Sequence, residues 1–265
     1  TADTEPDTLC TQVYCSLAPP PALNGFRRRF ETGSTWWLGA NGPSRILVLD
    51  PPGPADGPLW VARGDAAMRE VEVFCHPILV DSIDGQATLS QVVQYPLDQL
   101  LFIHRLAAAQ TVLLHSAAVE FGGGAVLFAG CSGAGKSTVA RMLSHRKGCK
   151  PLADDRVAVH LGATHVTAYG TPWPGEAGMG LNHALPAKAL CFLEQSDSTR
   201  LRRLTPAEAL PALLEVASIA WYEPEVRDVG LETLDGLLAS LPCYRLSFTR
   251  DSGRLTRVLE DLERC

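Results

Sequence analysis

The chain has 265 residues, of which 46% are hydrophobic and 20% charged, so it can bury a large core as an ordinary globular protein. The net charge of −6 argues against a general nucleic-acid or anionic-membrane binder, and no apolar run reaches the roughly 18 residues that a spanning helix needs. The acidic, polar residues 1–7 are unlike a secretion signal, so we expect a cytoplasmic protein with reduced cysteines.

The eight cysteines are spread singly along the chain. They form no Cys-x-x-Cys pair, and the histidines show no ligand spacing to them, so we expect no structural zinc. Cys75, Cys191 and Cys243 lie in apolar runs and are expected in the core.

Residues 1–95 alternate short β-type runs with clusters of proline and glycine. The runs cover residues 34–38, 45–49, 59–62 and 71–75, and one cluster reads Pro51-Pro52-Gly53-Pro54. This pattern predicts a small, mainly antiparallel β module over residues 1–95, which is a candidate for substrate docking or oligomer contact.

Residues 96–265 form the second predicted domain, and it begins with a helix over residues 97–109. Leu97, Leu100, Leu101 and His104 lie on one face of that helix, so we expect His104 to be a packed histidine rather than a catalytic one. From Thr111 onward the pattern is that of an α/β domain.

A complete phosphate-binding motif follows three strand-like runs at residues 112–116, 118–121 and 125–129. Residues 130–137 read Gly-Cys-Ser-Gly-Ala-Gly-Lys-Ser, and apolar residues then recur at helical spacing. A strand, a glycine loop and a helix start form an anion cradle from backbone N–H groups and the positive helix end. We therefore predict that Lys136 reaches the β- and γ-phosphates of a nucleotide and that Ser137 binds Mg²⁺.

The predicted nucleotide contacts all belong to this loop and the first turn of its helix. They are Gly130, Ser132, Gly133, Ala134, Gly135, Lys136, Ser137 and Thr138.

Two acids interrupt a short strand over residues 151–159. Asp154 and Asp155 follow Lys136 too closely for a distant Walker-B strand, so an adjacent strand would bring them beside the phosphates. Consecutive strand residues point to opposite sides, so the two carboxylates cannot share one role. One can hold metal or orient the loop, and the other can accept a proton from an attacking hydroxyl. An acidic turn that caps the next element is the alternative.

The remaining chain predicts further α/β elements. We expect strands over residues 187–193 and 244–248, a helix capped by Thr205 with Pro206 and Glu208, and helices over residues 231–241 and near the end of the chain.

The motifs together resemble the catalytic core of HPr kinase/phosphorylase. The segments that carry the resemblance, which spans residues 112–195, are His115-Ser116-Ala117, the strand through Phe128, the glycine loop and Leu152-Ala153-Asp154-Asp155-Arg156-Val157. It implies an α/β fold with a P-loop core similar to HPr kinase and to the nucleotide domain of phosphoenolpyruvate carboxykinase.

The resemblance also implies catalytic roles. Asp155 is then the base that activates a serine hydroxyl, and His115 lies beside the reacting centre with Lys136. Asp154 supports the metal or the loop geometry, although the roles of the two acids are interchangeable at this point. Glu176, in a segment that resembles the family's Glu plus Gly-x-Gly, has a metal or phosphate-side role or is a solvated loop acid.

One departure narrows the resemblance. The family's Pro-Gly-Arg-Asn-type segment is missing after residue 195, where Thr199-Arg200-Leu201-Arg202-Arg203 stands instead. This argues against phosphorylase activity and against HPr as the substrate, and favours a divergent branch that resembles peptide serine kinases of modified-peptide biosynthesis. The arginines either grip a phosphate or an acidic peptide tail, or are simply solvated. Residues 171–176 and 221–224, rich in Pro and Trp, either line a peptide or base site or act as hydrophobic anchors.

We therefore predict an ATP- and Mg²⁺-dependent kinase that acts on a serine of a peptide or small protein, with no nucleic-acid or membrane partner. The oligomeric state is not predicted, and a homo-oligomer is one possibility. A small-molecule kinase of the same fold and a non-catalytic nucleotide-binding module are the alternative functions. A phosphoenolpyruvate-carboxykinase-like enzyme would need a Lys/His metal pair and a set of arginines that we do not identify.

Overall fold

The computed structural model describes residues 10–33, 35–53, 55–90 and 92–263, and shows a mixed α/β protein. The acidic start of the chain, Ser34, Pro54 and Cys265, all used in the sequence predictions, lie outside these residues. Two compact units emerge. Unit 1 comprises residues 1–109 and 220–227, and unit 2 comprises residues 110–219 and 228–265. Within the described ranges, no helix has both the length and the apolar character to cross a bilayer.

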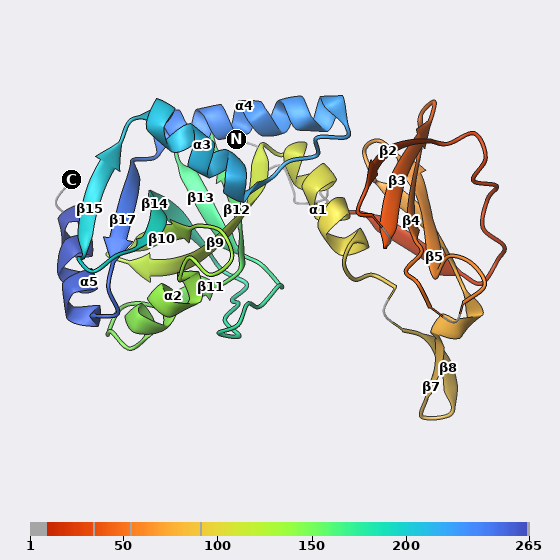
Figure 1. The fold of residues 1–265 in the computed structure, drawn as a ribbon, viewed down its shortest axis with the longest axis horizontal. Helices are drawn as coiled ribbons and strands as arrows, with labels where there is room; N and C mark the ends of the chain where they lie inside the picture. The colour runs from red at the N-terminus through yellow and green to blue at the C-terminus, as the bar shows by residue number, and fades with distance from the viewer. Residues whose placement is uncertain (1–9, 34, 54, 91, 264–265) are drawn as a thin grey trace, which may run out of the picture. The chain divides into compact units, whose positions relative to one another are not determined.

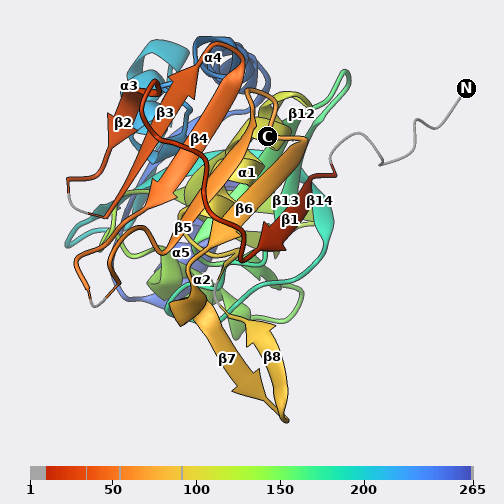
Figure 2. The ribbon, with the colours of Figure 1, turned by 90° about the vertical axis from the view of Figure 1, so that its right-hand side faces the viewer.

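Unit 1 is built on a six-stranded sheet, drawn in red to orange in Figure 1, in the order β1-β6-β5-β4-β3-β2, whose strands are all labelled in Figure 2. Its strands are β1 (Gln12–Ser16), β2 (Arg27–Glu31), β3 (Trp36–Asn41), β4 (Ser44–Leu49), β5 (Trp60–Asp65) and β6 (Glu70–Cys75). All neighbours are antiparallel except β1 and β6, which run parallel. A 3₁₀ turn (Pro77–Leu79) and the hairpin of β7 (Val80–Ile83) and β8 (Gln86–Leu89) follow, and Figure 2 shows this hairpin extending from the unit.

Helix α1 (Leu97–Ala107) packs on one face of this sheet. Leu97, Leu100 and Leu101 are buried in the same cluster as Leu38 and Trp60. The first segment of unit 1 therefore includes α1 and ends after Ala109, whereas the predicted β module ends at residue 95, because the apolar stripe of α1 covers the sheet that precedes it.

Residues 220–227 return to unit 1 from far along the chain. Tyr222 packs against the core cluster of unit 1, and its hydroxyl lies 3.1 Å from Nε2 of His104, whose Nδ1 contacts the carbonyl oxygen of Ala66 at 2.8 Å. Glu223 accepts two hydrogen bonds from the guanidinium of Arg45, at 2.5 and 3.0 Å. His104 is thus a packed residue, as its place on α1 predicted.

Unit 2 is built on a nine-stranded sheet. Its main path runs β10-β9-β12-β13-β14-β17-β15, with β11 and β16 beside β9. The strands are β9 (Thr111–Phe121), β10 (Gly124–Ala129), β11 (Pro151–Ala153), β12 (Arg156–Leu161), β13 (Val166–Gly170), β14 (Ala184–Gln195), β15 (Arg200–Leu204), β16 (Ala217–Ser218) and β17 (Cys243–Phe248). Strand β10 also pairs with β14 in parallel, so the path closes on itself.

Helices cover both faces of the unit 2 sheet. They are α2 (Lys136–Ser144), α3 (Pro206–Val216), α4 (Pro224–Ser240) and α5 (Ser252–Leu259), the last followed by a 3₁₀ turn (Glu260–Glu263). The residues of β10 alternate between the two cores, as expected for a strand between two helical layers. Leu127 lies in the core with α3 and α4, and Phe128 lies in the core with α2 and α5.

The predicted start of α3 is confirmed. Thr205 and Glu208 form the expected capping box, while Gly148, after α2, adopts a left-handed conformation with φ of +85°. No disulfide joins the seven described cysteines, and Cys75, Cys191 and Cys243 are buried, as expected.

Other elements differ from the sequence expectations. Helix α4 begins at Pro224 rather than at residue 231. Gly230, which interrupts the helical pattern in the sequence, lies inside the helix at a close contact, where a Cβ would lie 3.0 Å from Cδ1 of Ile219. Strands β13 and β15 were not predicted. The arginines of β15 hide its strand character, since sheet pairing rather than residue preference holds it extended.

Candidate active site

The loop between β10 and α2 turns sharply into the helix at Gly135. This residue has φ of +103°, and a Cβ placed on it would lie 2.6 Å from Cζ of Phe248 in β17. Only glycine combines this left-handed backbone with so close a neighbour. Helix α2 begins at the next residue, so its unpaired N–H groups face the loop. The loop and helix end form a cradle whose geometry favours an anion.

Lys136 folds back over the mouth of this loop. Its Nζ donates hydrogen bonds to the carbonyl oxygens of Gly130 at 2.9 Å and Cys131 at 3.0 Å, and to Nε2 of His115 at 2.9 Å. The side chain is buried, so its positive charge is held at a defined place.

His115 and Asp155 continue the contacts of Lys136. An ammonium group only donates, so Nε2 of His115 accepts and the ring proton is on Nδ1. Nδ1 lies 3.1 Å from the backbone oxygen of Asp155 and 3.3 Å from its Oδ1. Lys136, His115 and Asp155 are therefore joined in one polar chain, and the structure brings these three sequence-predicted residues together.

Electrostatics in this chain favour the ionised carboxylate. The hydrogen bond from His115 holds the pKa of Asp155 below its ordinary value of 3.8, and the positive charges of Arg156 and Lys136 act in the same direction against the effect of burial. Burial lowers the pKa of Lys136, while the nearby carboxylates of Asp155 and Glu176 act to raise it. Asp155 is consequently a carboxylate at neutral pH and can accept a proton.

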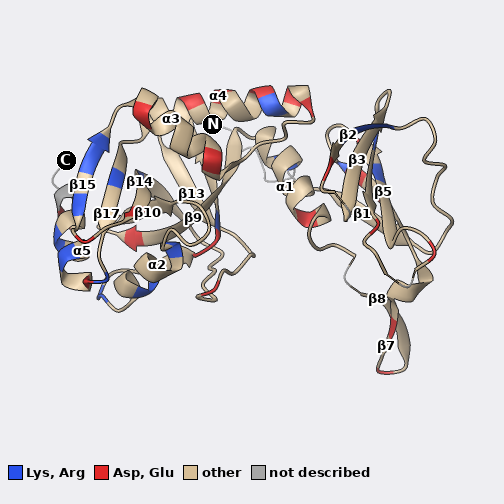
Figure 3. Cartoon of the chain, viewed as in Figure 1, with Lys and Arg blue, Asp and Glu red and all other residues tan. Residues whose placement is uncertain are grey.

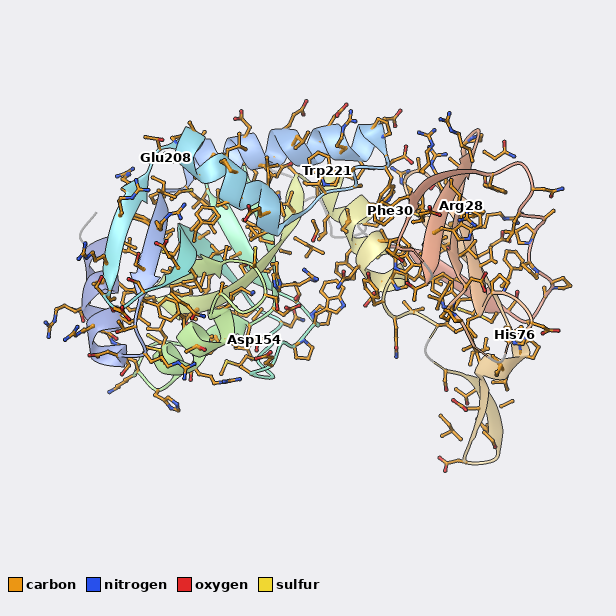
Figure 4. The ribbon with its side chains drawn as sticks, viewed as in Figure 1. Arg28, Phe30, His76, Asp154, Glu208 and Trp221 are labelled. Carbon is orange, nitrogen blue, oxygen red and sulfur yellow. The ribbon has the colours of Figure 1, made fainter. Side chains whose placement is uncertain are left out.

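Asp154 has a different set of partners. Its carboxylate is 1% exposed and accepts three backbone hydrogen bonds, from the N–H groups of Gly175 at 2.8 Å, Ala177 at 2.6 Å and Met179 at 3.2 Å. Figure 4 shows Asp154 beside this loop. The two acids lie in the bend between β11 and β12 rather than within a strand, but their carboxylates have separate partners. The contacts of Asp154 fit the loop-geometry role because both of its oxygens are occupied.

The loop that Asp154 holds carries Glu176. The side chain of Glu176 is exposed, its backbone oxygen accepts a hydrogen bond from Nη2 of Arg141 at 3.3 Å, and its charge acts on Lys136. An antiparallel bridge between Ala153 and Gly180 fixes the far end of the loop. Glu176 is thus in range to influence the cradle electrostatically.

Three contributing residues were not assigned from sequence. Gln195 at the end of β14 donates to the carbonyl oxygen of Gly133 at 2.7 Å, and Phe248 lies against Gly135. Nothing near either residue in the sequence marks it, because only the β10-β14-β17 pairing brings them to the loop. Arg156, with Nε 3.8 Å from Oδ2 of Asp155, stands directly after the two acids, so the acidic motif itself is the signal that marks it.

The oxygen donors near the loop decide which residues could bind Mg²⁺. No cluster of three or more His, Cys, Asp or Glu suited to a metal occurs among the described residues. Mg²⁺ keeps several waters and commonly takes one or two carboxylates plus substrate phosphates, so a full protein cage is not required. The hydroxyl of Ser137, partly exposed at the start of α2, and the carboxylates of Asp155 and Glu176 are oxygen donors of the right kind. Asp154 does not fit, because its oxygens already accept backbone bonds.

The aromatic segments singled out in the sequence occupy different settings. Within unit 1, Trp221 is 55% exposed while its neighbours Tyr222 and Glu223 are engaged in packing and an ion pair. In unit 2, Trp173 lies half-buried in the segment before Gly175. Tyr222 is therefore a hydrophobic anchor, whereas the ring of Trp221 is exposed.

Comparisons with known proteins place the chain in a family. No curated protein matches it in sequence. Among solved structures, it is similar to the HPr(Ser) kinase/phosphatase from Coxiella burnetii, at 11% identity over 56% of this chain and 94% of that chain, with a TM-score of 0.35. Residues 86–262 match the family described as SynChlorMet cassette protein ScmC. Because this match covers more than half of the 265 residues, the chain belongs to the ScmC family.

Proposed function

We propose that this protein transfers the γ-phosphate of ATP to a serine hydroxyl of a peptide or small protein. One observation carries the proposal: beside a glycine loop at a helix N-terminus, Lys136, His115 and Asp155 form a connected chain from a buried ammonium group to an ionised carboxylate. Phosphoryl transfer needs these parts, because it depends on positioning and on stabilising negative charge.

The chain's own residues account for the transfer as follows. Backbone N–H groups of residues 132–137 bind the nucleotide phosphates, and Lys136 moves its ammonium group from the loop carbonyls to the phosphate oxygens. Asp155 accepts the proton of the serine hydroxyl while the hydroxyl oxygen attacks the γ-phosphorus and the bond to the β–γ bridging oxygen breaks. His115 orients Asp155 and links it to Lys136.

Mg²⁺ would be held by Ser137 together with the carboxylate of Glu176, since Asp155 is the proposed base, and when bound it would neutralise charge on the phosphates. Asp154 fixes the loop from which Glu176 acts. Oligomer contact remains a proposed role for the surface of unit 1, where Trp221 is exposed.

The test is phosphate transfer from Mg²⁺-ATP to a library of serine-containing peptides, followed by mass spectrometry, with a metabolite library in parallel. We expect a phosphorylated peptide, and a loss of the rate by about a hundredfold or more in Asp155→Asn with nucleotide binding retained. Lys136→Ala should weaken nucleotide binding as well. Phosphorylation of metabolites alone would establish the small-molecule kinase instead, and ATP binding with no transfer would establish a nucleotide-binding module.

Asp197→Asn is the matched control, because Asp197 lies in the loop before β15, outside the Lys136–His115–Asp155 chain. Full transfer by Asp155→Asn would overturn the assignment of the base.

A further inference from the structure

Strand β15 forms one edge of the unit 2 sheet and is strongly basic. Within the described part of the chain it pairs with β17 alone, so its other side presents unpaired N–H and C=O groups. Its sequence is Arg-Leu-Arg-Arg-Leu, and all three arginines are exposed. Figure 3 shows this cationic edge on a chain whose net charge is −6.

A cavity of about 940 Å³ opens at the Leu204 end of this strand. Arg203 from β15 and Lys188 from β14 line it, and the described lining residues include no aspartate or glutamate. Lys188 donates a hydrogen bond to the carbonyl oxygen of Gly122, which leaves its charge without a carboxylate partner in the described chain. The cavity is therefore suited to an anionic group.

The positive charges of β15 are only partly neutralised. Nη1 of Arg202 lies 2.9 Å from Oε1 of Glu208. Figure 4 labels Glu208 at the start of α3. Arg200 and Arg203 form no ion pair with any described residue. Arg202 also lies directly opposite Arg245 in the register with β17, and Nε of Arg245 is buried without a hydrogen-bond partner among the described atoms. Like charges in this arrangement repel, so an added anion would be stabilising here.

The strand leads from the cavity towards the glycine loop. Leu204 pairs with Cys243 at the cavity end, and Arg200 pairs with Ser247 at the other end. The next residue of β17, Phe248, lies against Gly135 in the loop. Five strand residues span roughly 15 Å at about 3.3 Å per residue, a length that an extended peptide of similar size covers.

Arginines on an edge strand can also serve only to prevent aggregation. A comparison of the basic edge strands of the two units separates this role from peptide docking. In unit 1, the basic edge strand β2 has a register irregularity between Arg28 and Phe30 that breaks its pairing pattern. Strand β15 has a regular register over all five residues. A regular edge can act as a template for another strand, whereas a bulged one resists it.

We propose that β15, together with the cavity lined by Lys188 and Arg203, is a docking surface for an extended acidic segment of the polypeptide substrate. The segment adds to the sheet as a strand through main-chain hydrogen bonds. Its carboxylates are directed at Arg200 on one face of the sheet and at Arg203 on the other, and one carboxylate enters the cavity. This inference rests on the proposed function, because it places the docking of a peptide whose serine is phosphorylated at the loop.

Binding is measured without nucleotide, by fluorescence anisotropy of a labelled seven-residue peptide that has three consecutive glutamates between two valines and glycine ends, so that carboxylates face both sides of the sheet. It contains no hydroxyl residue, so it reports docking alone. A peptide with glutamine in place of glutamate is the matched probe. The test variant is Arg200→Gln/Arg203→Gln, and the control is Arg27→Gln/Arg29→Gln on the edge strand β2, which removes the same charge from unit 1.

We expect the acidic probe to bind in a salt-sensitive way, with a Kd about fivefold weaker or more in the β15 variant and unchanged in the β2 variant. Equal weakening by both variants, equal binding of the glutamine probe, or no binding would overturn the proposal. Circular dichroism verifies that each variant is folded, and Lys188→Gln, which lies outside β15, provides a second single-site variant with the same expected weakening.

Lys136→Ala should bind the probe as wild type does. If the probe binds at β15 but the protein transfers no phosphate, the docking surface stands and the proposed function is wrong. If the protein transfers phosphate but the probe does not bind at β15, the proposed function stands and the docking surface is wrong.

Discussion

The chain Lys136–His115–Asp155 shows how a single histidine sets the state of a carboxylate. His115 accepts from Lys136 through Nε2, and this fixes its proton on Nδ1, where it meets Asp155. Hydrogen bonding to the charged form stabilises that form, so the pKa of Asp155 falls. A histidine in this position therefore keeps the proposed base ionised rather than acting as the base itself.

His115→Ala should raise the pKa of Asp155 from its lowered value back towards 3.8, because the largest cause of the lowering is removed. The acid form of Asp155 then appears at higher pH in the variant than in the wild type. A pH titration of the side-chain carboxyl ¹³C resonance of Asp155 measures the midpoint directly.

His183→Ala is the control, because the His183 side chain is exposed and forms no described hydrogen bond or ion pair with Lys136, His115 or Asp155. If the midpoint of Asp155 is the same in His115→Ala and wild type, the histidine does not set the charge of Asp155.

Asp154 uses its carboxylate to hold backbone rather than to do chemistry. Asp154→Asn replaces one acceptor oxygen with an N–H₂ group that faces the N–H donors of residues 175–179, so at least one donor is left unpaired. We expect a loss of about 1–3 kcal/mol in the free energy of unfolding, measured by urea denaturation.

Glu176→Gln provides the comparison, since its exposed side chain should change stability by less than about 0.5 kcal/mol. A loss in Asp154→Asn no larger than that of Glu176→Gln would show that the three backbone bonds contribute little.

At the scale of elements, the strand β10, the glycine loop and α2 work as one unit because glycines at two positions meet different demands. Gly133 has φ of +80°, and a Cβ added to it would meet no atom within 4 Å, whereas Gly135 combines φ of +103° with Phe248 at 2.6 Å. A side chain at position 133 is therefore disfavoured by the backbone conformation alone, whereas one at position 135 is disfavoured by the backbone conformation and by the contact with Phe248.

The pair Gly133→Ala and Gly135→Ala separates these demands. Gly133→Ala should cost about 1–2 kcal/mol of stability from backbone strain, and Gly135→Ala clearly more because Phe248 must move. The measurements are urea denaturation and the Kd for Mg²⁺-ATP. Equal costs for the two variants would mean that the contact with Phe248 relaxes freely.

At the scale of the whole molecule, the chain leaves unit 2 after Ile219, contributes residues 220–227 to unit 1 and continues in unit 2 from Asp228. Arg45 and Glu223 form a buried ion pair there, with side chains 10% and 7% exposed. Breaking one partner of such a pair leaves an uncompensated charge, whereas replacing both partners by apolar residues is often neutral.

Glu223→Ala should lower the free energy of unfolding by about 3 kcal/mol, and Arg45→Met/Glu223→Leu should recover most of that loss. The hydrogen bond from Arg45 lowers the pKa of Glu223 from its ordinary value of 4.5, so the stabilisation is present above 4.5 and lost as pH falls through the lowered pKa. Urea denaturation at neutral and acidic pH measures both effects.

A destabilisation by Glu223→Ala that is the same at both pH values, or a double variant no more stable than the single one, would contradict this account.

Local rules were sufficient for the parts of the molecule that depend on neighbouring residues. The glycine loop and the capping box at Thr205 follow from backbone geometry over a few residues, and both were predictable from sequence. The roles of the loop residues remain predictions.

Only the tertiary structure decided which partners those residues meet. Gln195 and Phe248 reach the loop through the pairing of β10, β14 and β17, Asp154 meets a loop more than twenty residues away, and Tyr222 and Glu223 join unit 1 from beyond residue 219. Hydrophobic burial and strand pairing act between residues distant in sequence, and no local pattern records which distant residue supplies the contact.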